Sequence, residues 1–314
     1  MKKVSVFLIT YNHEAFIAQA IESIVTQQAN FDFELVIGED CSKDKTRAIC
    51  EEYAAKYPDI INLLPSERNY GPMANTIRTF QACKGEYIAL CEGDDYWAIP
   101  NKLQQQADFL DAHPDYTMCF SDTQIIDEMG WGLPDERYFP KIEKETITIK
   151  DIILSDVSLI PTATMLFRNI LPNPFPDFYY TSFSGDLFLH LFLADKGKAK
   201  YFNIKMAAYR NHAGGLTKSP EQIEKTYNNI FGFYITMNEY LGYRYDGLMR
   251  QRLFEMAKTR LIYGSREKKG MAKLKHYFKT MPNYIKYSKG FNLKEFMYYH
   301  AMLFFPSLLR KIKA

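Results

Sequence analysis

The sequence predicts an α/β fold in which helices cover both faces of a mainly parallel central sheet. Short apolar runs suited to buried strands alternate with segments whose apolar residues recur at helical spacing. At 314 residues the chain is long enough for one large α/β domain and a smaller part. Because parallel strands need a crossover helix between them, the alternation indicates a sheet with helices on both sides.

The predicted strands are short runs rich in apolar residues. They cover residues 4–9, 33–37, 60–64, 87–91, 117–126, 163–167 and 199–209. The predicted helices cover residues 17–25, 46–57, 101–110 and 187–194, and another follows Gly71-Pro72. In the first helix Ile17, Ile21 and Ile24 fall on one face, which is typical of a helix packed on a sheet.

A domain boundary is predicted near residue 216, where the alternation ends and a helical, basic segment begins. Residues 1–215 form the predicted sheet domain and residues 216–314 the helical segment. From residue 243 to the end, 17 Lys and Arg stand against four Asp and Glu, a net charge of +13 that leaves −11 on residues 1–242. Such a basic tail indicates an anionic partner. Because no nucleic-acid-binding motif accompanies it, we do not expect that partner to be a nucleic acid.

The last apolar run of the chain has two interpretations. Residues 296–305 are apolar and aromatic, and residues 308–313 end in basic side chains. At about 14 residues the run is shorter than the roughly 20 that a bilayer requires. It is either an interfacial helix that meets anionic lipid, or a helix packed on the sheet domain with a solvated basic end.

The remaining composition points to a cytoplasmic protein, and to a peripheral position at the inner face of the membrane if the tail is interfacial. The five cysteines lack the spacing of a zinc site or a disulfide framework. The apolar run at residues 4–9 stops without a cleavage site, so we expect a first strand rather than an export signal. Neither GxGxxG nor a Walker motif follows that strand, which argues against nicotinamide, flavin and P-loop proteins.

Acidic residues follow two of the predicted strands. Glu92-Gly-Asp-Asp comes directly after residues 87–91, and Glu39-Asp40 comes shortly after residues 33–37. Because ligands bind outside the carboxyl ends of parallel strands, these loops and Thr10-Tyr11-Asn12 are expected to meet in one cleft. Packed carboxylates repel one another, and a hard divalent cation relieves that repulsion. The sequence therefore predicts a metal site there.

These ordered motifs resemble the family 2 glycosyltransferases, inverting enzymes with a GT-A fold that use nucleotide-diphosphate sugars. The resemblance covers roughly residues 3–215. The opening stretch from Val4 to Asn12 is similar to the first strand of the family, whose end meets the nucleotide base. The resemblance therefore implies that Thr10 and Tyr11 bind the nucleotide sugar.

The second acidic cluster is similar to the Asp-Asp-x-Ser-x-Asp-x-Thr pattern of the family, in which an acidic side chain accepts a hydrogen bond from the uracil ring. Glu39 replaces the first Asp, so the resemblance assigns that role to Asp40. Glu39 and Asn69 are implied as further nucleotide-sugar-binding residues.

Residues 87–103 resemble the stretch around the DxD motif of the family. The resemblance implies that Asp94 and His212 bind Mn²⁺ or Mg²⁺ and that Glu92 and Asp95 contact the nucleotide sugar. Asp186 is similar to the general base of the family. Metal stabilisation of the leaving diphosphate and proton removal by a carboxylate give these residue types their chemical reason.

Simpler roles stand beside these assignments. Asp186 could serve only to cap a helix, and His212 could be a hydrogen-bonded loop residue. The ring of Tyr11 could pack in the core, and for His13 we expect a solvated side chain at the start of the first helix.

The resemblance implies an inverting, metal-dependent transfer of a sugar from a nucleotide-diphosphate sugar, with UDP as the first choice. A saccharide or lipid-linked saccharide in bacterial surface polysaccharide assembly is the implied acceptor. The alternative is a catalytically silent protein that binds nucleotide sugars. A nucleotidyltransferase is disfavoured because no Gly-rich, Arg/Lys-bearing phosphate loop follows the first strand.

Overall fold

The computed structural model describes residues 2–133, 139–182, 184–212, 220–266 and 270–288. The chain forms two compact units, residues 1–226 and residues 227–314. The boundary predicted near residue 216 lies outside the described residues.

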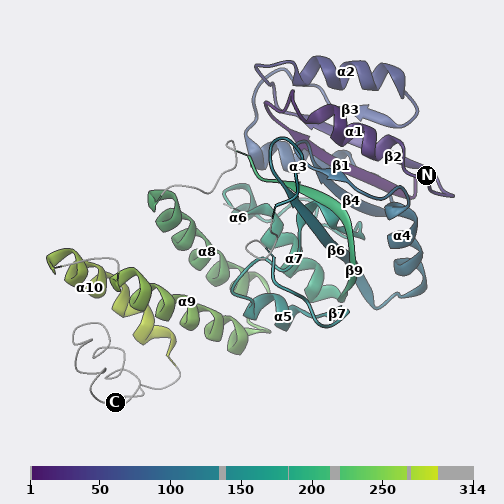
Figure 1. Cartoon of the computed structure of the whole chain (residues 1–314). Helices are drawn as coiled ribbons and strands as arrows, with labels where there is room; N and C mark the ends of the chain where they lie inside the picture. The colour runs from purple at the N-terminus through teal and green to yellow at the C-terminus, as the bar shows by residue number, and fades with distance from the viewer. Residues whose placement is uncertain (1, 134–138, 183, 213–219, 267–269, 289–314) are drawn as a thin grey trace. The chain divides into compact units, whose positions relative to one another are not determined.

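Nine strands of the described residues form one sheet in the first unit, in the order β3-β2-β1-β4-β8-β6-β9-β5, with β7 paired to β9 (Figure 1). The strands are β1 (Val4–Thr10), β2 (Phe33–Glu39), β3 (Ile61–Leu63), β4 (Tyr87–Glu92), β5 (Tyr96–Trp97), β6 (Tyr116–Ile126), β7 (Thr146–Ile147), β8 (Leu166–Arg168) and β9 (Lys198–Arg210).

Parallel pairing dominates this sheet. Strands β3, β2, β1 and β4 run parallel side by side, and the long pair β6 and β9 is also parallel. The short strand β8 lies antiparallel between β4 and β6, while β5 and β7 pair antiparallel with β9. The predicted mainly parallel sheet is therefore confirmed, with short antiparallel insertions.

Helices connect these strands. In the first unit they are α1 (Ile17–Val25), α2 (Thr46–Lys56), α3 (Pro72–Ala82), α4 (Lys102–Ala112), α5 (Ile149–Leu154), α6 (Asp177–Tyr180) and α7 (Gly185–Lys196), with a 3-10 turn at Thr162–Thr164. The second unit contains the end of α8 (Pro220–Tyr240), α9 (Asp246–Arg266) and α10 (Gly270–Tyr287).

The side chains of β1 show why both faces of the sheet need cover. Val6 and Leu8 are fully buried in a cluster that includes Ile21 of α1. Phe7 points to the opposite face and stacks on Phe80 of α3, with ring centroids 4.1 Å apart. Because successive strand residues point to opposite faces, an unbroken apolar run produces a sheet that is buried on both sides.

The strand predicted at residues 163–167 is shorter than expected. Residues 162–164 form a 3-10 turn, and β8 begins only at Leu166. Pro161 precedes the turn, and the Thr164 hydroxyl and backbone N–H both donate to its carbonyl oxygen. These local hydrogen bonds compete with strand pairing and delay the start of β8.

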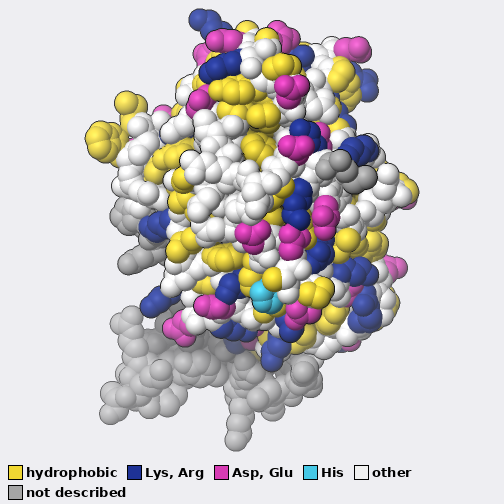
Figure 2. Space-filling view, turned by 90° about the vertical axis from the view of Figure 1, so that its right-hand side faces the viewer, with side chains coloured by type: hydrophobic (Ala, Val, Ile, Leu, Met, Phe, Trp, Pro, Cys, Tyr) yellow, Lys and Arg dark blue, Asp and Glu magenta, His cyan; other side chains and the backbone are white. Residues whose placement is uncertain are grey.

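In the second unit, His276 of α10 forms a hydrogen bond with the Arg260 carbonyl oxygen of α9 at 3.1 Å. Among the described residues no helix combines the length and the apolar character needed to cross a bilayer. The apolar and basic run at residues 296–313 lies outside the described residues. Figure 2 shows Lys and Arg interspersed with Asp and Glu over the described surface facing the viewer.

Candidate active site

The acidic loops meet at one edge of the sheet, as the sequence predicted. In the parallel registers, Thr10 at the end of β1 lies beside Glu39 of β2, and Ile9 lies beside Glu92 of β4. Adjacent strands lie about 4.8 Å apart, so the loops that leave these three ends are neighbours.

Gly93 allows the acidic turn after β4 to pass close to the end of β1. Its backbone N–H donates to the Ile9 carbonyl oxygen at 3.0 Å. A Cβ atom at this position would lie 2.5 Å from the Thr10 hydroxyl oxygen, closer than van der Waals contact permits. The turn then brings carboxylate oxygens of Glu92, Asp94 and Asp95 within 4.8 Å of one another.

The carboxylate of Asp94 also lies close to two histidines. Its Oδ2 forms a hydrogen bond with His212 Nε2 at 3.0 Å and lies 3.9 Å from His13 Nε2. The ligand atoms of these three residues lie within 4.8 Å of one another. His13 was expected to be solvated, but its side chain is only 19% exposed and faces Asp94. Imidazole and carboxylate groups so arranged can hold a divalent metal ion.

The carboxylates of the acidic turn repel one another. Burial and the negative charges of Asp94 and Asp186 raise the pKa of Glu92 to about 8. Burial and the negative charges of Asp94 and Glu92 raise the pKa of Asp95 well above its ordinary range. Burial would also raise the pKa of Asp94, but the hydrogen bond with His212 and the charge of His13 hold it below its ordinary value. A bound cation would relieve this repulsion.

The two histidines differ in their surroundings. Burial lowers the pKa of His13 despite the attraction of Asp94. The hydrogen bond with Asp94 raises the pKa of His212, and burial only partly opposes it. Neutral imidazole is the metal-binding form, so His13 is already in the state that a ligand requires near neutral pH.

Arg210, at the end of β9, holds the acidic turn from behind. Its backbone N–H donates to Asp95 Oδ1 at 2.9 Å, and its Nε donates to the Asp94 carbonyl oxygen at 2.9 Å. Its Nη1 donates to the carbonyl oxygens of Asp127 and Glu128. This role was not predicted from the sequence, although Arg210 stands only two residues before His212 in Tyr-Arg-Asn-His.

Asp40 and Asn69 are joined in the loop region beyond β2. The Asp40 carboxylate accepts the backbone N–H groups of Tyr70 at 2.7 Å and Gly71 at 3.0 Å. Asn69 Nδ2 donates to the Asp40 carbonyl oxygen at 2.8 Å, and the Asp40 N–H donates to the Thr10 carbonyl oxygen. The structure therefore brings these three sequence-predicted residues together.

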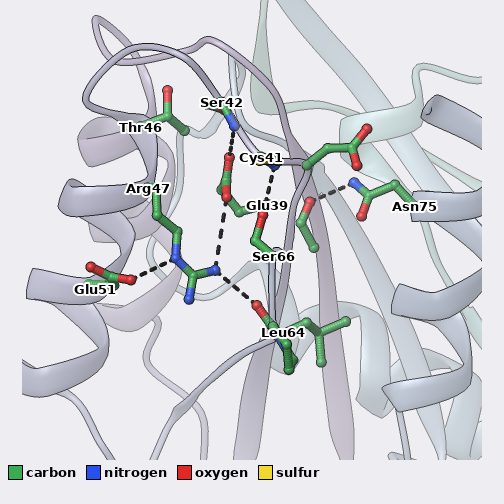
Figure 3. Close-up of polar contacts among 12 residues, drawn as sticks. Glu39, Cys41, Ser42, Thr46, Arg47, Glu51, Leu64, Ser66 and Asn75 are labelled. Atoms are coloured by element: carbon green, nitrogen blue, oxygen red, sulfur yellow. Dashed lines mark hydrogen bonds and ion pairs between the residues drawn. The ribbon is translucent and has the colours of Figure 1, made fainter. Parts of the chain in front are cut away.

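Glu39 lies under the loop rather than on its surface. Its Oε1 accepts the Ser42 N–H at 2.7 Å, and its Oε2 lies 3.9 Å from Arg47 Nη1 (Figure 3). The side chain is fully buried, and Oε2 has no hydrogen-bond partner among the described residues. Figure 3 also shows the Cys41 N–H directed to the Ser66 hydroxyl, at 2.7 Å. The observed contacts of Glu39 stabilise the loop that carries Asp40.

Tyr11 extends from the end of β1 with its side chain exposed. It is 39% exposed, which excludes the core-packing alternative. The neighbouring Asn12 has a positive φ of 55°, and its Oδ1 accepts the Lys43 N–H at 2.9 Å. The chain therefore turns sharply after Thr10 and leaves the Tyr11 ring accessible.

Asp186 lies in the first turn of α7. Its Oδ1 accepts the Leu187 N–H at 2.9 Å and the Ser184 hydroxyl. These contacts are typical of a carboxylate at a helix N-terminus. Its negative charge also contributes to the raised pKa of Glu92, so the carboxylate acts electrostatically on the acidic turn as well. The helix N-terminal role is therefore observed, and the role as general base stays a prediction.

Comparison with known proteins identifies the family. Residues 5–172 match the family model described as Glycosyl transferase family 2. The chain belongs to this family. Asp186, Arg210 and His212 lie beyond the part that the family model covers, whereas the loops after β1, β2 and β4 lie within it.

One relative of this family 2 chain and two solved structures with a similar fold are informative. The protein Rv1520 of Mycobacterium tuberculosis is 34% identical over 215 residues, which cover 68% of this chain and 60% of the relative. The structure of Staphylococcus aureus TarS, residues 1–349, in complex with UDP has a TM-score of 0.62 at 20% identity and covers 91% of this chain and 81% of its own. The mannosyltransferase PcManGT of Pyrobaculum calidifontis, in complex with GDP-Man and Mn²⁺, has a TM-score of 0.50 at 13% identity and covers 96% and 80%.

These two likenesses support the GT-A fold predicted from the sequence, with helices following it. The match spans about 60% of the length of the mycobacterial relative.

Proposed function

We propose that the chain is an inverting, metal-dependent glycosyltransferase that uses a nucleotide-diphosphate sugar. The observation that carries this proposal is the position of Asp94. It lies between two imidazoles at the carboxyl edge of β1 and β4, one strand away from the loop that holds Asp40. Nucleotide and metal sites must be neighbours for an ion to reach the diphosphate of a bound donor.

The loops around Asp40 are proposed to bind the nucleotide. Asp40 accepts a hydrogen bond from the base, Tyr11 offers an exposed ring for stacking, and Thr10 and Asn69 fix the loop geometry. UDP is the nucleotide we propose, because TarS, which shares the fold, is described in complex with UDP and with UDP-GlcNAc. The contacts of Glu39 stabilise the loop that carries Asp40, and Glu92 and Asp95 are proposed to contact the donor diphosphate and sugar.

Asp94 and His212 are proposed to hold Mn²⁺ or Mg²⁺. Asp94 Oδ2 and His212 Nε2 are 3.0 Å apart, and PcManGT is described with Mn²⁺. A divalent ion at this position supplies positive charge that stabilises the leaving nucleoside diphosphate by several kcal/mol. The chain contributes the carboxylate and imidazole groups, and Arg210 fixes the backbone of Asp94.

Asp186 is proposed as the general base that removes the proton from the acceptor hydroxyl. Its electrostatic effect on Glu92 indicates that it lies near the acidic turn, on the side of α7. A carboxylate in hydrogen-bond reach of the acceptor contributes about 10²–10⁴-fold in rate. One direct displacement inverts the anomeric centre, so no covalent enzyme nucleophile takes part.

A saccharide, free or linked to a lipid, is the acceptor we propose, in cell-surface polysaccharide assembly. TarS, one of the structural neighbours, is a poly(ribitol-phosphate) beta-N-acetylglucosaminyltransferase. A net charge of +13 on residues 243–314 supports a peripheral position on anionic lipid at the cytoplasmic side. Flotation with anionic liposomes tests this point, and a chain truncated at residue 288 that binds equally well contradicts a role for residues 289–314.

The donor reaction is tested by metal-dependent hydrolysis of a panel of nucleotide sugars, which needs no known acceptor. The wild type is compared with Asp94→Asn and with Asp108→Asn, an exposed carboxylate on α4 that serves as the matched control. Release of nucleoside diphosphate that is lost only in Asp94→Asn supports the transferase. Nucleotide-sugar binding without turnover, even with many acceptors, favours the catalytically silent binding protein instead.

A further inference from the structure

His13 is held in place by hydrogen bonds of its ring and of its main chain. It lies in the loop between β1 and α1, and its Nδ1 is 3.2 Å from the Thr10 hydroxyl oxygen. Its backbone N–H donates to the Thr46 hydroxyl at 2.8 Å. Its carbonyl oxygen accepts the N–H groups of Phe16 and Ile17, both at 2.9 Å. The main chain of the residue is therefore fixed before any ligand arrives.

The hydrogen bond with Thr10 is compatible with the tautomer that metal binding requires. When Nδ1 carries the proton, the Thr10 hydroxyl accepts it and Nε2 presents a lone pair. That Nε2 points to Asp94, whose Oδ2 is 3.9 Å away. Histidines that bind metals commonly donate their other ring N–H to such a partner, which fixes the orientation of the ring.

The spacing of the three groups suits one ion. Ligand atoms about 2.1 Å from an octahedral ion lie about 3.0 Å apart when adjacent and about 4.2 Å apart when opposite. The distances from Asp94 Oδ2 to His212 Nε2 and to His13 Nε2 are 3.0 Å and 3.9 Å, and all three ligand atoms lie within 4.8 Å. The first distance matches adjacent ligands of one ion, and the second lies between the adjacent and the opposite values.

We propose that His13 is a direct ligand of the divalent ion, and that the site consequently prefers transition-metal ions to Mg²⁺ and Ca²⁺. This inference rests on the proposed function, since it concerns the same metal. Imidazole nitrogen suits transition metals, whereas Mg²⁺ and Ca²⁺ prefer oxygen ligands. With His13 the protein contributes two imidazoles and one carboxylate, so nitrogen predominates in the set.

The competing role for His13 is to position Asp94 by a hydrogen bond, without touching the metal. Pulsed electron paramagnetic resonance of bound Mn²⁺ separates the two roles, because only a directly bound imidazole nitrogen couples strongly to the ion. The full chain is loaded with one equivalent of Mn²⁺ in the absence of nucleotide. We expect coupling from two imidazoles in the wild type and from one in His13→Ala and in His13→Gln.

Metal affinity gives an independent readout. Calorimetry with Mn²⁺ and Mg²⁺ alone should show that His13→Ala weakens Mn²⁺ binding by at least the roughly 10–100-fold that the loss of an outer-shell group costs, because a direct ligand is removed. Mg²⁺ binding should change less, so the ratio of the two affinities falls. His113→Ala, at an exposed residue at the end of α4, is the control and should match the wild type.

The outcomes distinguish this inference from the function on which it rests. Coupling from one imidazole that persists in His13→Ala and disappears in His212→Ala overturns the role of His13 and leaves the transferase proposal intact. Equal losses of Mn²⁺ and Mg²⁺ affinity in His13→Ala overturn the predicted metal preference. A wild type that binds no Mn²⁺, with or without UDP, overturns both proposals.

Discussion

Arg210 contacts Asp94 through the main chain and not through its carboxylate. The guanidinium Nε donates to the Asp94 carbonyl oxygen at 2.9 Å, while the Asp94 carboxylate forms its hydrogen bond with His212. The positive charge of Arg210 therefore stabilises the backbone of the acidic turn without neutralising the carboxylate that we assign to the metal. A salt bridge to the carboxylate would instead compete with the ion.

Replacing Arg210 should destabilise the protein. Arg210→Met removes the guanidinium donor that contacts the carbonyl oxygens of Asp94, Asp127 and Glu128, and we expect a loss of roughly 3–5 kcal/mol in the free energy of unfolding. Arg210→Lys keeps the charge but not the planar fork, so its loss should be intermediate. Urea unfolding measures both variants, and a change below about 1 kcal/mol for the Met variant would contradict the proposed bracing role.

Asp186→Asn should lower sugar transfer by about 10²–10⁴-fold while donor and Mn²⁺ affinities stay near those of the wild type. The amide preserves the shape of the side chain and its acceptor for the Leu187 N–H, but it cannot take a proton from the acceptor. Single-turnover kinetics with a saturating donor measures the chemical step. Asp177→Asn, an exposed acid in the first turn of α6, is the control for loss of charge at a helix N-terminus.

Glu92 should make the metal-free protein less stable as the pH rises. Its pKa is about 8 in the folded chain against an ordinary 4.5, so ionisation is harder in the folded state than in the unfolded state. The contribution of Glu92 to stability is greatest below pH 4.5 and is lost as the pH rises through 8, a decrease on the order of 5 kcal/mol. Unfolding with urea in the presence of EDTA at pH 5 and pH 8 measures this slope.

Glu92→Gln should reduce the slope, because the amide does not ionise. Saturating Mn²⁺ should reduce it in the wild type as well, since the cation stabilises the ionised carboxylate. A variant with the same slope as the wild type would assign the effect to another group, with Asp95 as the nearest one.

Lys102 should lower the free energy of unfolding at neutral pH. Its side chain is fully buried, with Nζ bonded to Gln106 Oε1 at 2.7 Å and 4.3 Å from the Trp97 ring centroid. Burial lowers its pKa to about 7 from an ordinary 10.5. Protonation therefore favours the unfolded chain, and this cost is complete below pH 7 and disappears as the pH rises through 10.5.

Lys102→Met should stabilise the protein by about 1–3 kcal/mol at pH 6, since the loss of the Gln106 hydrogen bond offsets part of the gain from removing a buried charge. The gain should be smaller at pH 9, where less of the cost of protonating Lys102 remains. Thermal unfolding at the two pH values tests the difference. Lys45→Met, at an exposed position, should show no comparable pH-dependent gain. An equal effect at both pH values would rule out the charge of Lys102 as the cause.

Much of the fold was predictable because its main signal is local. Each long strand is an apolar run, and each crossover helix has an apolar face, so residues such as Val6 and Ile21 carry their environment in the sequence pattern. The two-residue strands β5 and β7 were missed because they are too short to show any period. The antiparallel insertion of β8 depends on long-range pairing that no local pattern encodes.

The site was predictable in part for a similar reason. Asp40 and Asp94 follow strands directly, so the rule for carboxyl ends of parallel strands locates them. His13 and Arg210 were not located, since a lone histidine and a lone arginine in polar stretches have no distinctive spacing. Arg210 meets Asp95 across 115 residues, and only the pairing of β9 with β5 and β6 brings it there.

The position of β9 has a consequence for how the protein comes into being. Tyr96 and Trp97, directly after the acidic turn, pair with Ala208 and Ala207, and the brace and the second imidazole follow at residues 210 and 212. During synthesis, the loops that we assign to the nucleotide emerge from the ribosome well before these residues. A nascent or clipped chain that stops short of β9 would hold its acidic turn without Arg210 and His212, so the proposed metal site would form only as the sheet domain nears completion.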